Sequence, residues 1–224
     1  MQDRFIAGVE GLLRPETRAE SRLGIVLTAG AERKRSPILD SAGVRQVDSS
    51  GNIIYGQRLM PILEGQLRSM VALRGLACGN IDGLIIVGGA LKDGRPEADI
   101  YREYLLPCAE RRGIDPSHLM VIKSGRNTDS DLDHLRRLLM EFNYGGTLAI
   151  YSSGYHLAAK PVQEFVKKLK CQTIFERVEE DSTYKRVAKR IFTPAYVAKQ
   201  EKRYRRRDYF PSRVRKVVAY FIRG

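Results

Sequence analysis

Three short apolar runs in this chain each lead into small or polar residues, and this pattern constrains the fold more than any other feature. The first run is 84–87 and precedes Gly88-Gly89, the second is 119–122 and precedes Ser124, and the third is 148–151 and precedes Ser152. Segments with helical periodicity separate the runs, which is typical of parallel strands connected by helices. The carboxyl ends of such strands gather at one edge of the sheet, where open α/β folds bind ligands.

Two more strands complete the predicted sheet. Residues 23–27 form an earlier strand and residues 172–175 a later one. The turn-rich sequence 48–52 interrupts the α/β rhythm and predicts a small antiparallel hairpin at about 43–58, placed over the edge of the sheet that bears the site. The expected fold is an α/β, Rossmann-like three-layer sandwich of about five parallel strands, with this hairpin insert and a basic helical C-terminal extension.

The positive charge is concentrated near one end of the chain. The 224 residues carry a net charge of +13. Residues 185–224 hold 14 Lys and Arg against 2 Asp and Glu, a net of +12, whereas residues 1–184 hold 25 against 24. These counts predict a helical lead at 1–22, a nearly neutral α/β domain at 23–182 and a basic extension at 183–224.

Cysteine usage and apolar run length argue against several classes of protein. Cys78, Cys108 and Cys171 are an odd number without Cys-x-x-Cys pairing, so we expect neither a disulfide framework nor a metal site. No apolar run approaches the roughly 18 residues of a membrane span, and the first residues lack a signal-peptide pattern. We therefore expect a cytoplasmic protein, with peripheral attachment to a membrane as the alternative.

The segment after the first strand is a candidate anion site. Residues 28–35 have the composition of a small-residue turn with three cations. Backbone N–H groups around Gly30 could seat an anion that Arg33 or Arg35 would then hold. A solvated loop with scattered charge explains the same residues equally well.

The Gly-Gly pair after residues 84–87 is a second candidate. Gly88 and Gly89 have no side chain to keep a ligand from the backbone. Glu97 lies in the first turn of the next expected helix, where an acidic residue most commonly favours the helix dipole. Glu97 becomes a candidate catalytic group only if the fold places it beside the other loops.

The segment from Ser124 onward precedes an amphipathic helix. Asn127 or Thr128 is a suitable N-cap, and Asp129 and Asp131 lie in the positive first turn. Capping alone explains these residues. The functional interpretation uses the same helix N-terminus to present N–H groups and hydroxyls to a ligand.

The fourth candidate follows residues 148–151 and comprises Ser152, Ser153, Tyr155 and His156. A histidine that titrates near neutrality can act as an acid, a base, a metal ligand or a hydrogen-bond donor, although a lone histidine is more often structural. The position of His156 directly after a strand favours it over the other two histidines. No Gly-x-Ser-x-Gly sequence surrounds Ser153, so a serine hydrolase triad is not supported.

Together these loops resemble the YdcF-like family of bacterial domains, which includes the SanA and ElyC envelope proteins. The resemblance spans about residues 23–180 and rests on Val87-Gly88-Gly89 with Glu97, on Ser-x-x-Asn-Thr from Ser124 to Thr128, and on Ser-x-Tyr-His from Ser153 to His156. It implies a Rossmann-like three-layer fold with a pocket at the carboxyl ends of the strands. It also implies S-adenosylmethionine as a candidate ligand and a link to envelope polysaccharide and peptidoglycan metabolism.

The chain departs from the family pattern at two positions. Asp131 stands where the family usually has asparagine, and Ala159 followed by Lys160 stands where it has arginine. Loss of a bidentate arginine weakens the case for an anionic ligand. Family members commonly carry an N-terminal membrane anchor, for which we see no pattern here, so we do not expect an envelope location to carry over.

The basic extension has no counterpart in the family pattern. Thr193-Pro194 predicts the start of a helix over 195–208, in which tyrosines interleave with lysines and arginines as on nucleic-acid surfaces. A second helix from Pro211 has an amphipathic pattern that suits an anionic membrane surface or a subunit interface. A solvated helical extension that packs through its apolar stripe is the simpler alternative.

Two functional hypotheses follow. The first is a small-molecule-binding domain, with turnover left open, whose nucleotide-type, phosphorylated or sugar ligand lies across these loops. Its assigned roles are N–H donation by Gly89 and Thr128, hydroxyl contacts from Ser124 and Ser153, and proton transfer or orientation by His156 with Glu97 as its acidic partner. The second is a binding module whose arm, residues 185–224, docks nucleic acid or an anionic membrane surface.

Overall fold

The computed structural model describes residues 21–38, 44–123 and 127–209, with only the backbone for 203–209. Five strands form one parallel sheet in the order β7-β4-β1-β8-β9. They are β1 (Arg22–Leu27), β4 (Gly83–Val87), β7 (Leu119–Ile122), β8 (Thr147–Ser152) and β9 (Gln172–Arg177). The predicted parallel sheet is confirmed, whereas the helical lead predicted at 1–22 falls almost entirely outside the described residues.

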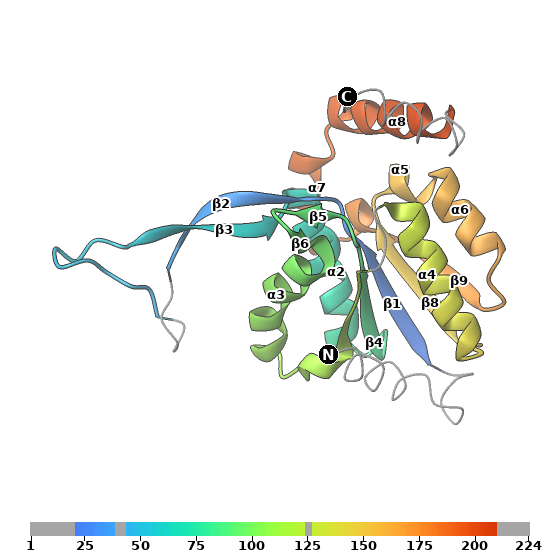
Figure 1. Ribbon diagram of the computed structural model, residues 1–224, viewed down its shortest axis with the longest axis horizontal. Helices are drawn as coiled ribbons and strands as arrows, with labels where there is room; N and C mark the ends of the chain where they lie inside the picture. Colours follow the sequence, from blue (N-terminus) through green and yellow to red (C-terminus); the bar gives the residue numbers. More distant parts are fainter. Residues whose placement is uncertain (1–20, 39–43, 124–126, 210–224) are drawn as a thin grey trace.

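Helices cover both faces of the sheet, which confirms the three-layer sandwich (Figure 1). One face carries α2 (Leu63–Ala77), α3 (Glu97–Glu110) and α7 (Lys185–Ile191); the other carries α4 (Thr128–Glu141), α5 (Gly154–Leu157) and α6 (Lys160–Lys167). Short 3-10 turns lie at Pro116–His118 and Val178–Glu180. None of the helices in the described part of the chain is both long and apolar enough to cross a membrane.

The apolar runs form strands because helices bury both sides of the central sheet. Val26 and Ile86 face α2 and α3, whereas Ile25 and Val87 face the opposite helical layer. All four side chains are at most 2% exposed. Continuous apolar runs, rather than alternating ones, are what parallel strands buried on both faces require.

The antiparallel hairpin is present but longer than predicted, and its strands lie elsewhere. Strands β2 (Ala31–Pro37) and β3 (Tyr55–Pro61) pair along their whole length and project from the body (Figure 1). The segments expected to be its strands lie at its tip, where Val47 bridges Ile53. The turn predicted at 28–35 is therefore wrong from Ala31 onward. Every residue of β2 is half-buried or exposed, so the strand accommodates charged residues and charge did not distinguish it from a loop.

The C-terminal region packs on the body through apolar side chains of its first helix. Ala188 and Ile191 of α7 are buried in the hydrophobic cluster on the α2 face. The following helix α8 (Pro194–Tyr209) confirms the helix predicted at 195–208, and its Tyr196 N–H donates to Thr193 Oγ1 at 3.3 Å as in an N-cap. The helix predicted from Pro211 lies outside the described residues. A smaller hairpin pairs β5 (Leu91–Lys92) with β6 (Arg95–Pro96).

Candidate functional site

The backbone joins the segments that follow three neighbouring strands. Thr28 N–H donates to the Val87 carbonyl at 3.0 Å, and Gly88 N–H donates to the Ile122 carbonyl at 2.9 Å. The first turn of α3 is attached to the same place, because Ala98 N–H donates to the Gly88 carbonyl at 2.9 Å. The carboxyl ends of β1, β4 and β7 thus form one continuous edge.

Glycine at position 88 is required by the close approach of Thr28. A Cβ at Gly88 would lie 2.1 Å from Thr28 Oγ1 and 2.6 Å from its Cγ2. The carboxyl group of Glu97 accepts hydrogen bonds from the Thr28 side chain and from the Gly30 backbone N–H. The neighbouring Gly89 N–H, predicted to donate to a ligand, donates to Asp131 Oδ1 at 3.0 Å. We call these residues the Glu97 cluster: Thr28, Gly30, Gly88, Gly89, Glu97 and Asp131.

The two carboxyl groups of the Glu97 cluster affect each other electrostatically. Burial raises the pKa of Glu97, and the nearby Asp131 raises it further, although the hydrogen bond from Thr28 opposes this. Asp131 is itself buried. Glu97 therefore holds a proton to a higher pH than an ordinary glutamic acid does.

Asn127 begins α4 in the capping arrangement that its sequence predicts. Ser130 N–H donates to Asn127 Oδ1 at 2.9 Å, and Asn127 N–H donates to Ser130 Oγ at 3.3 Å. Thr128 is the first residue of the helix. Ser124 lies outside the described residues. Capping thus accounts for the Asn127 side chain, while Asp131 in the same helical turn reaches the Glu97 cluster.

A buried ion pair lies at the carboxyl ends of β1 and β8. Glu64 and Arg68, one turn apart on α2, are 2% and 1% exposed and form a salt bridge. Arg68 Nη1 donates to the Leu27 carbonyl at 2.9 Å and lies 3.0 Å from His156 Nδ1. Arg68 Nη2 donates to Ser153 Oγ at 2.8 Å. The guanidinium therefore links α2 to the ends of both strands.

The carboxylate of Glu64 accepts hydrogen bonds from three hydroxyl groups as well. Ser153 Oγ donates at 2.8 Å, Tyr155 OH lies 2.5 Å from both carboxylate oxygens, and Tyr196 OH donates to Oε2 at 2.6 Å. Burial alone would raise the pKa of Glu64, but the charge of Arg68 and these hydroxyl donors lower it to about 2. Glu64 is thus anionic at neutral pH. We call this set the Glu64 cluster: Glu64, Arg68, Ser152, Ser153, Tyr155, His156 and Tyr196.

The phenols of the Glu64 cluster stay protonated. Burial raises the pKa of Tyr196 to about 12, and its hydrogen bond to the Glu64 carboxylate acts in the same direction. The pKa of Tyr155 is raised as well, chiefly by burial. Both residues therefore act as hydrogen-bond donors to Glu64.

The hydrogen bonds of His156 assign its tautomer. An arginine side chain can only donate, so Nδ1 accepts from Arg68 Nη1. Ser152 Oγ also lies 3.0 Å from Nδ1. The ring proton of neutral His156 is then on Nε2, which makes Nε2 a hydrogen-bond donor.

Tyr101 and residues 27–30 together connect the two clusters. The Tyr101 hydroxyl accepts from the Ala29 N–H at 2.8 Å and donates to the Gly30 carbonyl at 3.1 Å, while its ring packs against Gly65, where a Cβ would lie 1.9 Å from the phenol oxygen. Leu27, at the end of β1, contacts Arg68 in the other cluster. Residues 27–30 thus bridge the clusters.

Most of the predicted site residues lie in these clusters. Gly30, Gly88, Gly89 and Glu97 are in the Glu97 cluster, and Ser152, Ser153, Tyr155 and His156 are in the Glu64 cluster. Arg33 lies apart on β2, where it is exposed and its Nε donates to Asp93 Oδ2 at 2.7 Å. In the described part of the chain, no group of three or more His, Cys, Asp or Glu is arranged to hold a metal ion.

Glu97, expected to be the acidic partner of His156, lies in the Glu97 cluster. The carboxylate that shares Arg68 with His156 is that of Glu64. Neither Glu64 nor Arg68 was predicted, although a signal existed. They share a helical face with the apolar Leu67 and Val71, and a charged pair on such a face is unusual.

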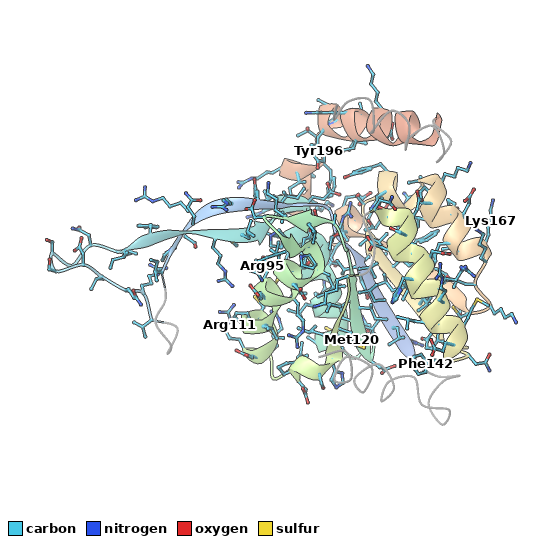
Figure 2. All side chains as sticks on the ribbon, in the orientation of Figure 1. Arg95, Arg111, Met120, Phe142, Lys167 and Tyr196 are labelled. Atoms are coloured by element: carbon cyan, nitrogen blue, oxygen red, sulfur yellow. The ribbon has the colours of Figure 1, made fainter. Side chains whose placement is uncertain are left out.

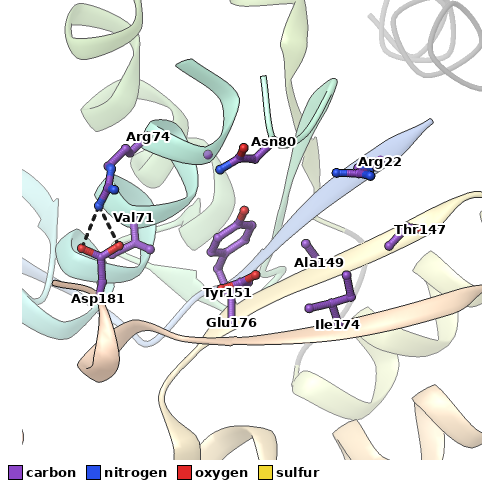
Figure 3. A pocket seen from close by; sticks show the side chains of 11 residues that line it. Arg22, Val71, Arg74, Asn80, Thr147, Ala149, Tyr151, Ile174, Glu176 and Asp181 are labelled. Atoms are coloured by element: carbon purple, nitrogen blue, oxygen red, sulfur yellow. Dashed lines mark hydrogen bonds and ion pairs between the residues drawn. The ribbon is translucent and has the colours of Figure 1, made fainter. Parts of the chain in front are cut away.

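A separate hollow of about 240 Å³ lies on the α2 face of β8 and β9 (Figure 3). Arg22 and Thr147, the first residues of β1 and β8, line it together with Tyr151. At its border, Arg74 Nη1 donates to both carboxylate oxygens of Asp181 at 3.0 Å. The hollow thus runs along β8 and β9, and none of the residues that line it belongs to the Glu97 cluster or the Glu64 cluster.

Comparison of the chain with protein-family models, with curated proteins and with solved structures found no match. The resemblance to the YdcF-like family therefore stays a prediction that rests on the three motifs.

Proposed function

We propose that the chain is an α/β domain that binds and acts on a small polar molecule at the carboxyl edge of its sheet. The observation that supports this most is the Glu64 cluster. A buried ion pair stabilises a fold little compared with apolar side chains of the same volume, so its presence calls for another reason. Titratable groups with strongly shifted pKa values are typical of functional sites.

The chemistry of the clusters favours a ligand with hydroxyl or protonated amine groups. Glu64, Glu97 and Asp131 offer carboxylate oxygens, and the Gly89 N–H is already paired with Asp131. Carboxylates accept hydrogen bonds and repel phosphate. Among the nucleotide-type, phosphorylated and sugar ligands predicted above, nucleosides and sugars fit best. S-adenosylmethionine, implied by the family resemblance, carries both ribose hydroxyls and an ammonium group.

The clusters also divide acid and base roles between two carboxyl groups. The pKa of Glu97 is raised and that of Glu64 is lowered to about 2, an arrangement that enzymes use for proton transfer. We assign to Glu97 the transfer of a proton to or from the ligand. Glu64 stays anionic and binds a donor group, while His156 presents its Nε2–H.

A thermal-shift screen of the full chain tests this proposal. Its panel contains adenosyl compounds, nucleosides, nucleotides, sugars and sugar phosphates. A ligand at 100 times its Kd stabilises the folded state by about 2.7 kcal/mol, or about 5–10 °C in Tm. Glu97→Gln should reduce that shift, whereas Glu103→Gln, an exposed change on the same helix, should keep it. The proposal fails if no compound shifts Tm, or if both variants respond as the wild type does.

The basic extension supports a second candidate function, the docking of nucleic acid or an anionic membrane surface. On α8 the side chains of Lys199 and Lys202 are exposed, one turn apart, while Tyr196 points toward the body. The cations described on this helix are thus available to an external partner. The link to envelope polysaccharide metabolism belongs with this candidate and rests on the family resemblance alone.

Charge reversal tests this second candidate better than deletion of residues 185–224, which would remove the buried α7 side chains. The double variant Lys199→Glu/Lys202→Glu should weaken binding to a single-stranded oligonucleotide or to anionic vesicles, with wild-type binding falling steeply as salt rises. Lys167→Glu/Lys168→Glu, an exposed pair on the opposite helical layer, is the matched control. Equal binding by all three proteins would exclude docking through α8.

A further inference from the structure

Tyr196 belongs to the basic extension, yet its phenol completes the Glu64 cluster. Its side chain points from α8 toward the carboxyl edge (Figure 2), and its hydroxyl lies 2.6 Å from Glu64 Oε2. We propose that α8 is a cover over the ligand site and that Tyr196 is its latch. The phenol then occupies, at Glu64, the position that a donor group of the ligand takes when α8 lifts.

The burial of the Glu64 cluster requires some part of the protein to move before a ligand can enter. Glu64, Arg68, Ser153 and His156 are each at most 2% exposed. Helix α8 packs against α5, which carries Tyr155 and His156. A ligand that reaches Glu64 must therefore displace a neighbouring element.

Among the neighbouring elements, α8 has weak attachments. In its first half Ala195, Ala198 and Lys199 are exposed, and Tyr196 is the described α8 residue that packs against the α2-side core. Its ring meets Phe192 edge to face at a centroid distance of 6.4 Å. By contrast, α2 places six apolar side chains in the core: Leu67, Val71, Ala72, Leu73 and, half-buried, Met70 and Leu76. Elements with few buried apolar contacts are the ones that open locally.

The latch defines the ligand group that can replace it. Glu64 Oε2 accepts from both Tyr155 and Tyr196. A ligand hydroxyl or ammonium can take over the Tyr196 bond to this ionised carboxylate, whereas a phosphate cannot. This part of the inference rests on the proposed ligand site, while the covering role of α8 does not.

Chemical modification of histidine tests the cover in the full chain. Diethyl pyrocarbonate reacts with accessible imidazole rings, and peptide mass spectrometry reports each histidine separately. His118 and His134 are half-buried at the surface and serve as internal references, whereas His156 is 1% exposed. In the wild type we expect His156 to react far more slowly than both references. If His156 reacts as fast as they do, α8 does not cover the site.

The variant Tyr196→Phe removes only the hydroxyl of the latch. We expect His156 to react about tenfold faster in it, the factor that corresponds to a lost hydrogen bond of ~1.4 kcal/mol. The reference histidines should keep their rates. Lys199→Ala, on the outer side of the same helix, is the matched control and should behave as the wild type. Unchanged His156 reactivity in Tyr196→Phe would overturn the latch.

Two further measurements keep the inference testable. Amide hydrogen exchange of the wild type should be faster in residues 195–202 than in α2, and equal protection would refute the cover even if Tyr196→Phe did not fold. Any compound that raises Tm in the screen should bind Tyr196→Phe several-fold more tightly than the wild type. If the screen finds no binder, the proposed function is refuted but the covering role of α8 is not. If a binder is found and His156 reacts as fast as the reference histidines, the covering role is refuted but the proposed function is not.

Discussion

Replacement of Arg68 with methionine should lower the free energy of unfolding by about 3–5 kcal/mol at neutral pH, the usual cost of breaking a buried ion pair. Methionine fills the space of the aliphatic part of Arg68 but leaves the Glu64 carboxylate buried without its counter-ion. The Leu27 carbonyl and Ser153 Oγ lose a donor in the same change. The cost thus arises mainly from the buried Glu64 carboxylate and the other polar groups that lose Arg68 as their partner.

The pH dependence distinguishes this explanation from a simple packing defect. The folded-state pKa of Glu64 is about 2 against a reference of 4.5, so its ionisation contributes about 3 kcal/mol of stability above pH 4.5. That contribution is lost as the pH falls from 4.5 toward 2. Without Arg68 the buried carboxyl takes up a proton more readily. The difference between variant and wild type should therefore shrink on acidification.

Urea denaturation followed by circular dichroism at several pH values provides the measurement. Arg74→Met is the matched control, because Arg74 lies on the same helix and its salt bridge to Asp181 is partly exposed, at 42% and 16%. Its loss should cost less than about 1 kcal/mol. In the double variant Glu64→Gln/Arg68→Met, part of the lost stability should return. The reasoning is refuted if Arg68→Met costs no more than Arg74→Met, or if its cost is the same at pH 4 as at pH 7.

Gly88→Ala should destabilise the fold by about 1–3 kcal/mol, because the added methyl group meets the stiff, β-branched Thr28 side chain. Gly145→Ala, with no atom within 4 Å of the added Cβ, should stay within about 0.5 kcal/mol in the same thermal denaturation; equal effects would contradict the close approach. An NMR titration of the side-chain carboxyl carbons should place the midpoint of Glu97 above 4.5, and Asp131→Asn should lower it. Because the folded-state pKa of Glu97 is raised, this group stabilises the fold at low pH, and that stability is lost as the pH rises through the midpoint. A midpoint at or below 4.5 would exclude the acid role of Glu97.

The parallel sheet could be predicted because burial on both faces leaves a direct trace in the sequence. Residues 84–87, 119–122 and 148–151 are apolar without interruption, and each does form a strand. The hairpin was misplaced for the opposite reason. None of the β2 residues is buried in the core, so hydrophobic periodicity does not mark residues 31–37 as a strand.

Part of the candidate site could be predicted from the sequence. Small polar residues after strands identified Gly88 and His156, since sheet topology brings the ends of parallel strands together. Glu64 and Arg68 were missed because charged residues on helices are usually at the surface. Tyr196 lies 132 positions from Glu64 in the chain, so no local pattern could connect them.

The projecting ribbon of β2 and β3 has a consequence for how this protein can change over evolutionary time. In the described part of the chain, the two hydrophobic clusters contain no residue between Ala31 and Pro61. Mutations along the ribbon are therefore largely exempt from the packing constraints that act on the body. Its length and surface chemistry can therefore change at little cost to the core, and side chains retained there would record what the ribbon touches rather than what the core needs.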